Sequence, residues 1–398
     1  MSEILNSAIS SVQQSKAAWC RFITGNDTGK TGSHQAGFYI PKCASALLFD
    51  KPGRKGEFKE KIVKVKWQDD FTTESCMKYY GQKSRNEYRI TRFGQGFPFL
   101  QDDNVGDLLI LAKFTEEDYA GYVLSSDEDI EDFFAAFNLA PDATNQLIDV
   151  EGSAKPNVKI AQMLKEFADR FRDFPETRIM ATGAQDCYNK AYRINDRILQ
   201  KQPDKILTDW IDTETVLFKY LEEKVYADMI SQHFESVEDF TEKANQVLNR
   251  RKSRAGKSLE HHLSAIFTSN ELIFDEQAVT EDNKKPDFLF PNAECYHNFQ
   301  FPAEDLTMLG AKTTCKDRWR QVINEADRIW PKHLFTLQPG ISKNQLKEMA
   351  DNQVKLVVPH KNISTFPLEY QSSLIDLSGF IAMVKNKQEC QSKYFFFD

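Results

Sequence analysis

Residues 283–291, NKKPDFLFP, and residues 306–312, LTMLGAK, decide the fold of the C-terminal half of this chain. Both contain short apolar runs of the kind that form buried strands. The first run follows Asp287, and the second ends at Lys312. If the two strands pair, the carboxylate that enters one strand lies beside the ammonium that ends its neighbour. The pattern therefore predicts a charged site built on a small sheet.

Helical and strand patterns alternate around these two strands. A helix is predicted at 316–330, because apolar residues recur along one stripe before Pro331. The order of elements in this half predicts a mixed sheet that is covered on both faces. The remaining predicted elements are a helix at 257–270, a strand at 333–338, a helix at 342–353 and a strand at 354–359.

The first 140 or so residues have a different pattern, which is typical of strands. Short apolar or alternating runs, such as KIVKVKW and LLILAKF, are separated by clusters of Gly, Asp, Asn and Lys. This pattern is typical of a compact β-barrel or pseudobarrel. We therefore predict an α+β protein with a pseudobarrel domain at 1–150, a linker at 151–158 and an α/β domain with a central mixed sheet at 159–398.

Composition narrows the class of protein. The chain has 398 residues, of which 41% are hydrophobic and 28% charged, as in a globular protein of two or three domains. No stretch is apolar over a length that spans a bilayer, so no membrane association is expected. The seven cysteines are scattered and form no CxxC pair, which argues against a zinc site or a disulfide framework. We expect a reduced, cytoplasmic protein.

The net charge of −8 argues against a polyanionic partner, but binding to nucleic acid depends on local fields. Two basic stretches stand out, NRRKSRAGK at 249–257 and KSRNEYRITR at 83–92. Either stretch alone is most often a solvated face. Their presence in both halves of the chain favours a DNA-binding role somewhat.

A phosphodiester-cleaving site needs converging carboxylates to hold Mg²⁺ and a cation near the scissile phosphate. Asp287 and Lys312 supply one of each. The usual second acid lies two residues before the lysine, where this chain has Gly310. Glu325, on the predicted 316–330 helix beside its apolar stripe, is the candidate replacement, and Glu260 is a candidate fourth member. The alternative without a functional site is that Asp287 is a surface acid and Lys312 a strand-end lysine, with no shared role.

Several long motifs resemble the EcoRII-type restriction endonucleases, which have the PD-(D/E)xK nuclease fold. In the C-terminal half they are RRKSRAGKSLE at 250–260, NKKPDFLFP at 283–291 and KTTCKDRWRQVINEAD at 312–327. In the N-terminal half, 26–41 and 84–96 resemble the pseudobarrel with which this family binds effector DNA. The resemblance covers most of the chain and weakens at 100–245.

The resemblance implies a set of roles. Asp287 and Glu325 would hold Mg²⁺, Lys312 would be the catalytic lysine and Glu260 a supporting acid. Lys316, Asp317 and Arg318 would read G·C pairs in the major groove, as their donor and acceptor groups allow. The effector-DNA positions would be His34, Tyr39, Lys83, Arg85, Glu87 and Arg89.

The resemblance also implies a bacterial Type II restriction endonuclease that acts as a homodimer on duplex DNA at CCWGG. Its N-terminal domain would block the catalytic cleft until effector DNA binds. One departure concerns the family's base-flipping helix, because the corresponding stretch DWIDTETVLF lacks the expected arginines. Trp210 in this stretch could stack on a flipped base, although a core position is the more common role of such a residue.

Two other functions are compatible with these residues. One is a nuclease of the same fold that acts in repair or cleaves modified DNA. The other is a sequence-specific DNA-binding protein with a degenerate nuclease fold, an alternative that Gly310 favours and that Asp287, Lys312 and Glu325 oppose.

Overall fold

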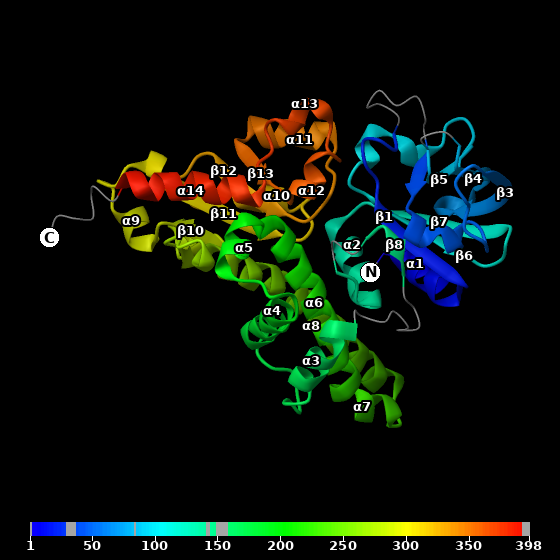
Figure 1. Cartoon of the computed structure of the whole chain (residues 1–398), viewed down its shortest axis with the longest axis horizontal. Coiled ribbons are helices and arrows are strands. Elements are labelled where there is room, and N and C mark those ends of the chain that lie inside the picture. The colour runs from blue at the N-terminus through cyan, green and yellow to red at the C-terminus, as the bar shows by residue number, and fades with distance from the viewer. Residues whose placement is uncertain (1, 29–36, 83–84, 141–143, 149–157, 392–398) are drawn as a thin grey trace. The chain divides into compact units, whose positions relative to one another are not determined.

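The computed structural model describes residues 2–28, 37–82, 85–140, 144–148 and 158–391. The chain divides into two compact units, shown in Figure 1. Unit 1 comprises residues 1–154, 338–346 and 364–371, and unit 2 comprises 155–337, 347–363 and 372–398. The predicted linker at 151–158 falls almost entirely outside the described residues. None of the described helices is long and apolar enough to cross a membrane.

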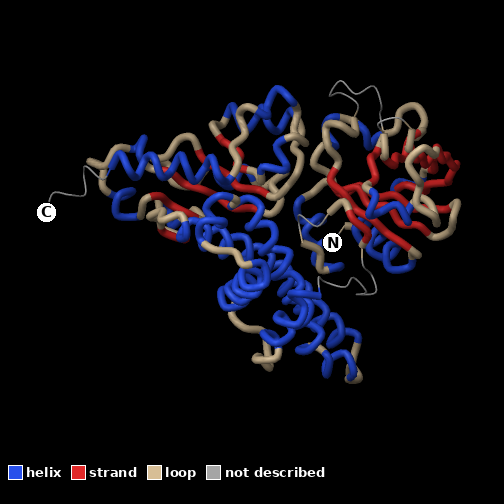
Figure 2. Tube along the Cα trace, viewed as in Figure 1, coloured by secondary structure: helices blue, strands red, loops and turns tan. Residues whose placement is uncertain are grey.

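Unit 1 is built on one curled sheet of eight strands in the order β2-β5-β4-β3-β7-β6-β1-β8 (Figure 2). All neighbouring strands are antiparallel except β3 and β7, which run parallel. The strands are β1 (Ala17–Phe22), β2 (Phe38–Ile40), β3 (Phe58–Trp67), β4 (Thr72–Tyr80), β5 (Glu87–Thr91), β6 (Leu108–Lys113), β7 (Asp118–Leu124) and β8 (Gln146–Leu147). Helices α1 (Glu3–Gln14) and α2 (Asp127–Phe137) complete the unit's N-terminal part.

The two faces of this sheet enclose separate apolar cores. On β1, Trp19 packs in an aromatic-rich core with Trp67 and Phe97, whereas the neighbouring Cys20 and Phe22 pack with helices α1 and α2. This alternation is the period-2 pattern of a strand that is buried on both faces. The strands predicted from KIVKVKW and LLILAKF are confirmed as parts of β3 and β6.

Unit 2 begins with a layer of helices and continues into a sheet. The helices of the layer are α3 (Val158–Ala168), α4 (Thr177–Tyr192), α5 (Asp196–Lys201), α6 (Pro203–Val225), α7 (Ala227–Ser231) and α8 (Val237–Ser269). The helix predicted at 257–270 forms the C-terminal part of the 33-residue helix α8, which Ser236 caps through its hydroxyl.

The sheet of unit 2 has five strands in the order β13-β12-β11-β10-β9. β9, β10 and β11 pair antiparallel, and β11, β12 and β13 pair parallel, so the predicted mixed sheet is confirmed. The strands are β9 (Asp275–Glu276), β10 (Phe288–Phe290), β11 (Thr307–Lys312), β12 (Lys332–Thr336) and β13 (Val354–Val357). The later helices of the chain are α9 (Ala293–His297), α10 (Trp319–Ile323), α11 (Lys343–Asp351), α12 (His360–Ile363), α13 (Leu368–Gln371) and α14 (Leu377–Gln391).

Each face of the sheet packs against different helices. On one face, Phe288 contacts Phe267 of α8, and His333 contacts Phe380 of α14. On the other face, a side chain added at Gly310 would meet Val322 of α10. Because side chains alternate along a strand, Lys312 shares the Gly310 face, and the register places Asp287 there too. The α10 face therefore carries the predicted site.

The helix predicted at 316–330 is wrong in extent, because α10 covers only Trp319–Ile323. Glu325 lies in the loop that follows, and Ala326 adopts a left-handed conformation with φ 50 that a helix cannot continue. The apolar stripe still packs inward, since Val322, Ala326 and Ile329 are buried. Periodicity identified the buried side chains correctly, but the backbone leaves the helix after one turn.

We predict that Gly310→Ala destabilises the protein. The added Cβ would lie 2.8 Å from Cγ2 of Val322, closer than packed carbon atoms tolerate. Overpacking of this kind costs about 1–3 kcal/mol of unfolding free energy, which thermal denaturation would detect. Gly256→Ala is the matched control, because nothing lies within 4 Å of a Cβ added there. An unchanged melting temperature for Gly310→Ala would contradict this prediction. So would a double variant, Gly310→Ala with Val322→Ala, that recovers none of the lost stability.

Candidate active site

Asp287 and Lys312 meet as the two strands predict. Asp287 is 8% exposed and directly precedes β10, whereas Lys312 is half-buried at the end of β11. Lys312 Nζ lies 3.2 Å from Asp287 Oδ2, and the same oxygen accepts a 2.7 Å hydrogen bond from the backbone N–H of Ala311. The pairing of β10 with β11 therefore positions the carboxylate from the backbone as well as from the ammonium.

Gln277 connects this pair to Glu260. Its side-chain amide donates to Asp287 Oδ1 at 2.8 Å and to Glu260 Oε2 at 3.3 Å. Its backbone N–H donates to the carbonyl of Asp287 at 3.1 Å. Glu260 Oε2 also accepts from Lys257 Nζ at 2.7 Å, one turn earlier on α8. Glu260 thus lies one hydrogen-bonded neighbour away from Asp287.

Glu325 is half-buried, and its carboxyl lies in the field of the same two residues. Burial, followed by the negative charge of Asp287, raises the pKa of Glu325 from its ordinary value of 4.5 to about 7. Lys312 and Lys332 act in the opposite direction and lower this pKa. The negative charge of Asp287 therefore disfavours ionisation of Glu325. A cation bound between the two carboxylates would offset their repulsion.

The residues fit a hard divalent cation. Asp287 and Glu325 offer carboxylate oxygens, the donors that Mg²⁺ prefers, and Mg²⁺ commonly takes only one or two carboxylates and retains several waters. Within the described part of the chain, no cluster of three or more His, Cys, Asp or Glu side chains is arranged to bind a metal.

The three predicted base-reading residues lie in the turn between β11 and α10. Lys316 is 9% exposed, Arg318 is half-buried and Asp317 is exposed. They follow the strand that ends in Lys312, four to six residues further along the chain. Their role in reading bases stays a prediction.

Four of the predicted effector-DNA positions are described, and His34 and Lys83 lie outside the described residues. Tyr39 of β2 lies directly opposite Arg89 of β5, and Arg89 Nε lies 3.4 Å from Glu87. The guanidinium of Arg85 lies over the ring of Tyr80, 5.6 Å from its centroid. Tyr39, Glu87 and Arg89 lie on the paired strands β2 and β5, and Arg85 lies between β4 and β5.

Trp210 occupies a core position. It is 1% exposed, its indole N–H donates to Asn189 at 3.0 Å, and its ring lies 5.7 Å from that of His262. The core interpretation of this residue therefore agrees with its surroundings in the helical layer. In this conformation the ring is not presented to a base.

Much of the basic run at 249–257 is used inside unit 2. The guanidinium of Arg250 lies 4.4 Å from the ring centroid of Phe174, and Arg251 donates to Glu222 at 2.7 Å. Arg254 is 4% exposed and lies 3.8 Å from Glu214, and Lys257 pairs with Glu260. These contacts give four of the run's side chains partners inside unit 2, whereas the sequence suggested a solvated face or a DNA-binding surface.

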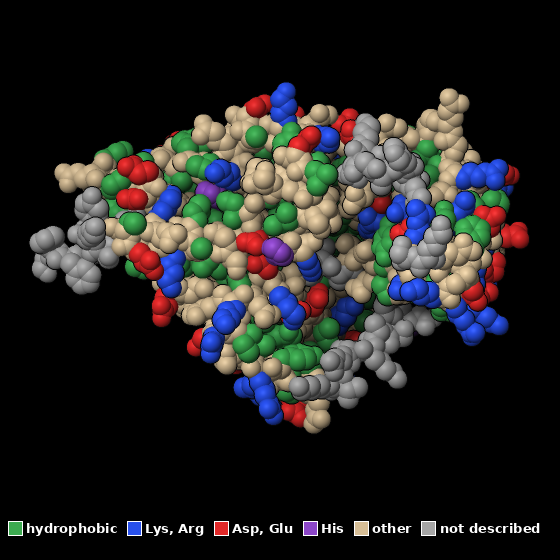
Figure 3. Space-filling model, turned by 45° about the horizontal axis from the view of Figure 1, so that its top comes forward, with side chains coloured by type: hydrophobic (Ala, Val, Ile, Leu, Met, Phe, Trp, Pro, Cys, Tyr) green, Lys and Arg blue, Asp and Glu red, His purple; other side chains and the backbone are tan. Residues whose placement is uncertain are grey.

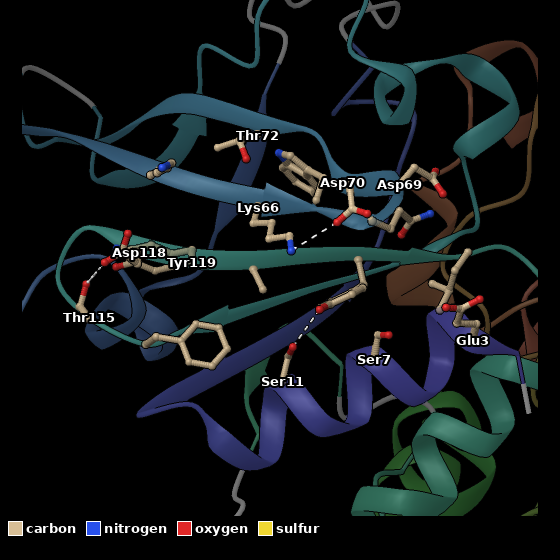
Figure 4. Close-up of a pocket in the computed structure, with 17 residues that line it drawn as sticks. Glu3, Ser7, Ser11, Lys66, Asp69, Asp70, Thr72, Thr115, Asp118 and Tyr119 are labelled. Atoms are coloured by element: carbon tan, nitrogen blue, oxygen red, sulfur yellow. Dashed lines mark hydrogen bonds and ion pairs between the residues drawn. The ribbon is translucent and has the colours of Figure 1, made fainter.

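A groove of about 800 Å³ lies in unit 1 between α1 and the strands β3 and β7 (Figure 4). Its lining carries both signs of charge, and Lys66 pairs with Asp70 across its rim. Ser11 hydrogen-bonds Tyr122 on its floor at 2.8 Å. None of the described effector-DNA candidates lines it. Charges of both signs are also interspersed over the face shown in Figure 3.

Two residues of the site were not found from the sequence. Gln277 joins Glu260 to Asp287, and Lys332 donates to the backbone carbonyls of Glu325 and Ala326. Gln277 directly follows the exposed Glu276 and carries no sequence signal. Lys332 left one weak signal, because it is a lysine at the start of a buried strand.

Comparison with known proteins covers both halves of the chain. The family described as "EcoRII C terminal" matches residues 218–381, and "Restriction endonuclease EcoRII, N-terminal" matches residues 12–147. The Type II restriction enzyme EcoRII of Escherichia coli is 38% identical over 381 residues, which cover 90% of this chain and 92% of that enzyme.

Two solved structures show weaker likeness. One is metal-depleted Ecl18kI in complex with uncleaved, modified DNA, with a TM-score of 0.45, 18% identity and coverage of 60% of this chain and 87% of that one. The other is the complex of restriction endonuclease PspGI with substrate DNA, with a TM-score of 0.44, 16% identity and coverage of 55% and 94%.

The long match to one enzyme and the separate matches of both halves agree with the pairing of Asp287 and Lys312 on adjacent strands. The chain belongs to the EcoRII family of Type II restriction endonucleases.

Proposed function

We propose that this endonuclease cuts duplex DNA at CCWGG with Mg²⁺, through a site formed by Asp287, Lys312 and Glu325. The observation that carries the proposal is the 3.2 Å contact of Lys312 with Asp287, beside which burial and the charge of Asp287 raise the pKa of Glu325. The 38% identity to EcoRII supports the same substrate class.

Each residue has a chemical task in this proposal. Asp287 and Glu325 would hold the metal ion, which supplies Lewis-acid stabilisation of the phosphate and a water of lowered pKa when it is bound. Lys312 would stabilise the negative charge that develops on the scissile phosphate. The side-chain amide of Gln277 orients Asp287 through a hydrogen bond, and Glu260 accepts a hydrogen bond from the same amide.

The finer assignments rest on the family. We propose that Lys316, Asp317 and Arg318 read the G·C pairs of the site, and that His34, Tyr39, Lys83, Arg85, Glu87 and Arg89 bind effector DNA. Two copies of the chain are needed to cut both strands of a near-palindromic site, so the working enzyme is a homodimer. Residues 1–150 act as the effector domain and 159–398 as the catalytic domain of a cytoplasmic bacterial enzyme.

Digestion of a plasmid with several CCWGG sites, with and without Mg²⁺, tests the proposal. We expect discrete fragments only with Mg²⁺, and sequencing of their ends should place each cut before the first C. Binding without cleavage in the presence of Mg²⁺ would favour a DNA-binding protein instead. Cleavage restricted to methylated sites would favour a modification-dependent nuclease.

We predict that Lys312→Ala lowers the single-turnover cleavage rate by about 10²–10³-fold, as expected when one group that stabilises transition-state charge is removed. Binding of a CCWGG duplex without metal should stay within a few-fold of the parent protein, because Asp287 keeps its hydrogen bonds from Ala311 and Gln277. Lys285→Ala, in the segment that leads into β10, is the control and should leave the cleavage rate unchanged. A variant that keeps its cleavage rate would remove Lys312 from the site.

We also predict that removal of residues 1–150 raises cleavage of DNA that carries a single CCWGG site. If the N-terminal domain blocks the catalytic cleft, its removal abolishes a coupling that typically amounts to about 5-fold or more. The comparison is the initial rate on a one-site and a two-site plasmid, with full-length and truncated chains. Equal rates for both chains on the one-site plasmid would exclude autoinhibition.

A further inference from the structure

The loop position of Glu325 creates a mechanical requirement. An acid two residues before Lys312 would be fixed by the ladders on both sides of β11. Glu325 instead lies two residues beyond the end of α10, where no strand pairing holds its backbone. Metal ligands must be held within roughly 0.5 Å of their working geometry. Other contacts must therefore fix this loop.

Lys332 makes such a contact directly behind Glu325. It is the first residue of β12 and is 0% exposed. Its ammonium donates to the backbone carbonyls of Glu325 and Ala326, the latter at 2.5 Å. The indole of Trp330 covers the same ammonium, with its centroid 4.5 Å from Nζ. The strand itself is anchored by the Lys332 N–H, which donates to Gln353 at 3.0 Å.

Two further residues pin the next part of the loop. The N–H of Asp327 donates to Glu281 at 3.2 Å, and the N–H of Arg328 donates to the hydroxyl of Tyr296 at 3.3 Å. These contacts hold the loop downstream of Glu325. Lys332 binds the backbone carbonyl of Glu325 itself, whose N–H donates to the Val322 carbonyl at 3.2 Å.

A lysine is a costly choice for such a buried position. Removal of an ammonium from water is expensive unless its donors find partners, and a methionine of similar length would fill the space without that cost. Burial lowers the pKa of Lys332 from 10.5 to about 8. The use of a charged side chain here is explained by the two carbonyls that its donors satisfy, since apolar side chains cannot bond them.

We propose that Lys332 is a positioning residue for the active site, whose buried ammonium fixes the Glu325 peptide so that the loop-borne carboxylate meets the metal ion. This inference rests on the proposed function, because it takes Glu325 as a metal ligand. Lys332 itself touches neither the metal nor the DNA.

The test compares Lys332→Met with Lys387→Met in the full-length chain. Lys387 is a half-buried lysine that donates to Leu306 O and Thr307 Oγ1 at 3.0 Å each, at the far end of β11 from Lys312. Like Lys332, it donates to a backbone carbonyl, but it lies away from Glu325. For each variant we would measure Mn²⁺ binding by electron paramagnetic resonance, the Mg²⁺ concentration that gives half-maximal cleavage, and the melting temperature.

We expect Lys332→Met to weaken Mn²⁺ binding roughly tenfold, as is common when a residue that orients a metal ligand is lost. The Mg²⁺ requirement for cleavage should rise by a similar factor. Lys387→Met should lower the melting temperature and leave both metal measurements unchanged. On a Glu325→Gln background, Lys332→Met should weaken Mn²⁺ binding no further, because the ligand that it positions is already absent.

Unchanged Mn²⁺ binding in folded Lys332→Met would overturn the inference, and so would an equal loss in Lys387→Met. If Lys332→Met does not fold, Lys332→Gln, whose amide retains a donor, is judged by the same criteria. Wild-type protein that binds Mn²⁺ but cuts no DNA would refute the proposed function, while the binding comparison would still decide the role of Lys332. Wild-type protein that binds no Mn²⁺ would refute both.

Discussion

The antiparallel pairing of β10 with β11 is the constraint on which the site depends. It brings Asp287 beside Gly310, Ala311 and Lys312, although 25 residues separate Asp287 from Lys312 along the chain. The backbone N–H of Ala311 binds one oxygen of Asp287, and the amide of Gln277 binds the other. The position of the carboxylate is therefore a consequence of strand register, and a shift of one residue would turn it to the opposite face.

The same register explains why the second acid lies elsewhere. Gly310 faces α10, and even a methyl group there would meet Val322 at 2.8 Å. An acid at this position would require α10 to move away from the sheet. The chain instead ends α10 after one turn and presents Glu325 from the following loop, at the same face. The close packing of α10 thus leaves no room for an acid at position 310, and Gly310 gives little support to a degenerate site.

The sequence predicted the parts of this arrangement that depend on local pattern. The apolar runs beside Asp287 and Lys312 identified both strands, and the stripe from Val322 to Ile329 identified the buried side of the segment that follows. It did not predict where α10 ends, because the apolar period continues through Ala326 and Ile329 while the backbone turns left-handed at Ala326 and the ammonium of Lys332 binds the Ala326 carbonyl. Gln277 escaped prediction, since its role depends on where β9 places it. The basic run at 249–257 drew attention as a DNA-binding candidate for lack of such information. The sequence alone did not reveal that Glu214, Glu222 and Glu260 would pair with it.

The central claim is that carboxylates from a strand and from a loop hold one metal ion. Crystals soaked in Mn²⁺ would test it most directly through anomalous scattering, which locates the ion without reference to activity. We expect one strong peak per chain, in contact with oxygen atoms of both Asp287 and Glu325. A peak bound by Asp287 and Glu260, with Glu325 turned away, would contradict it.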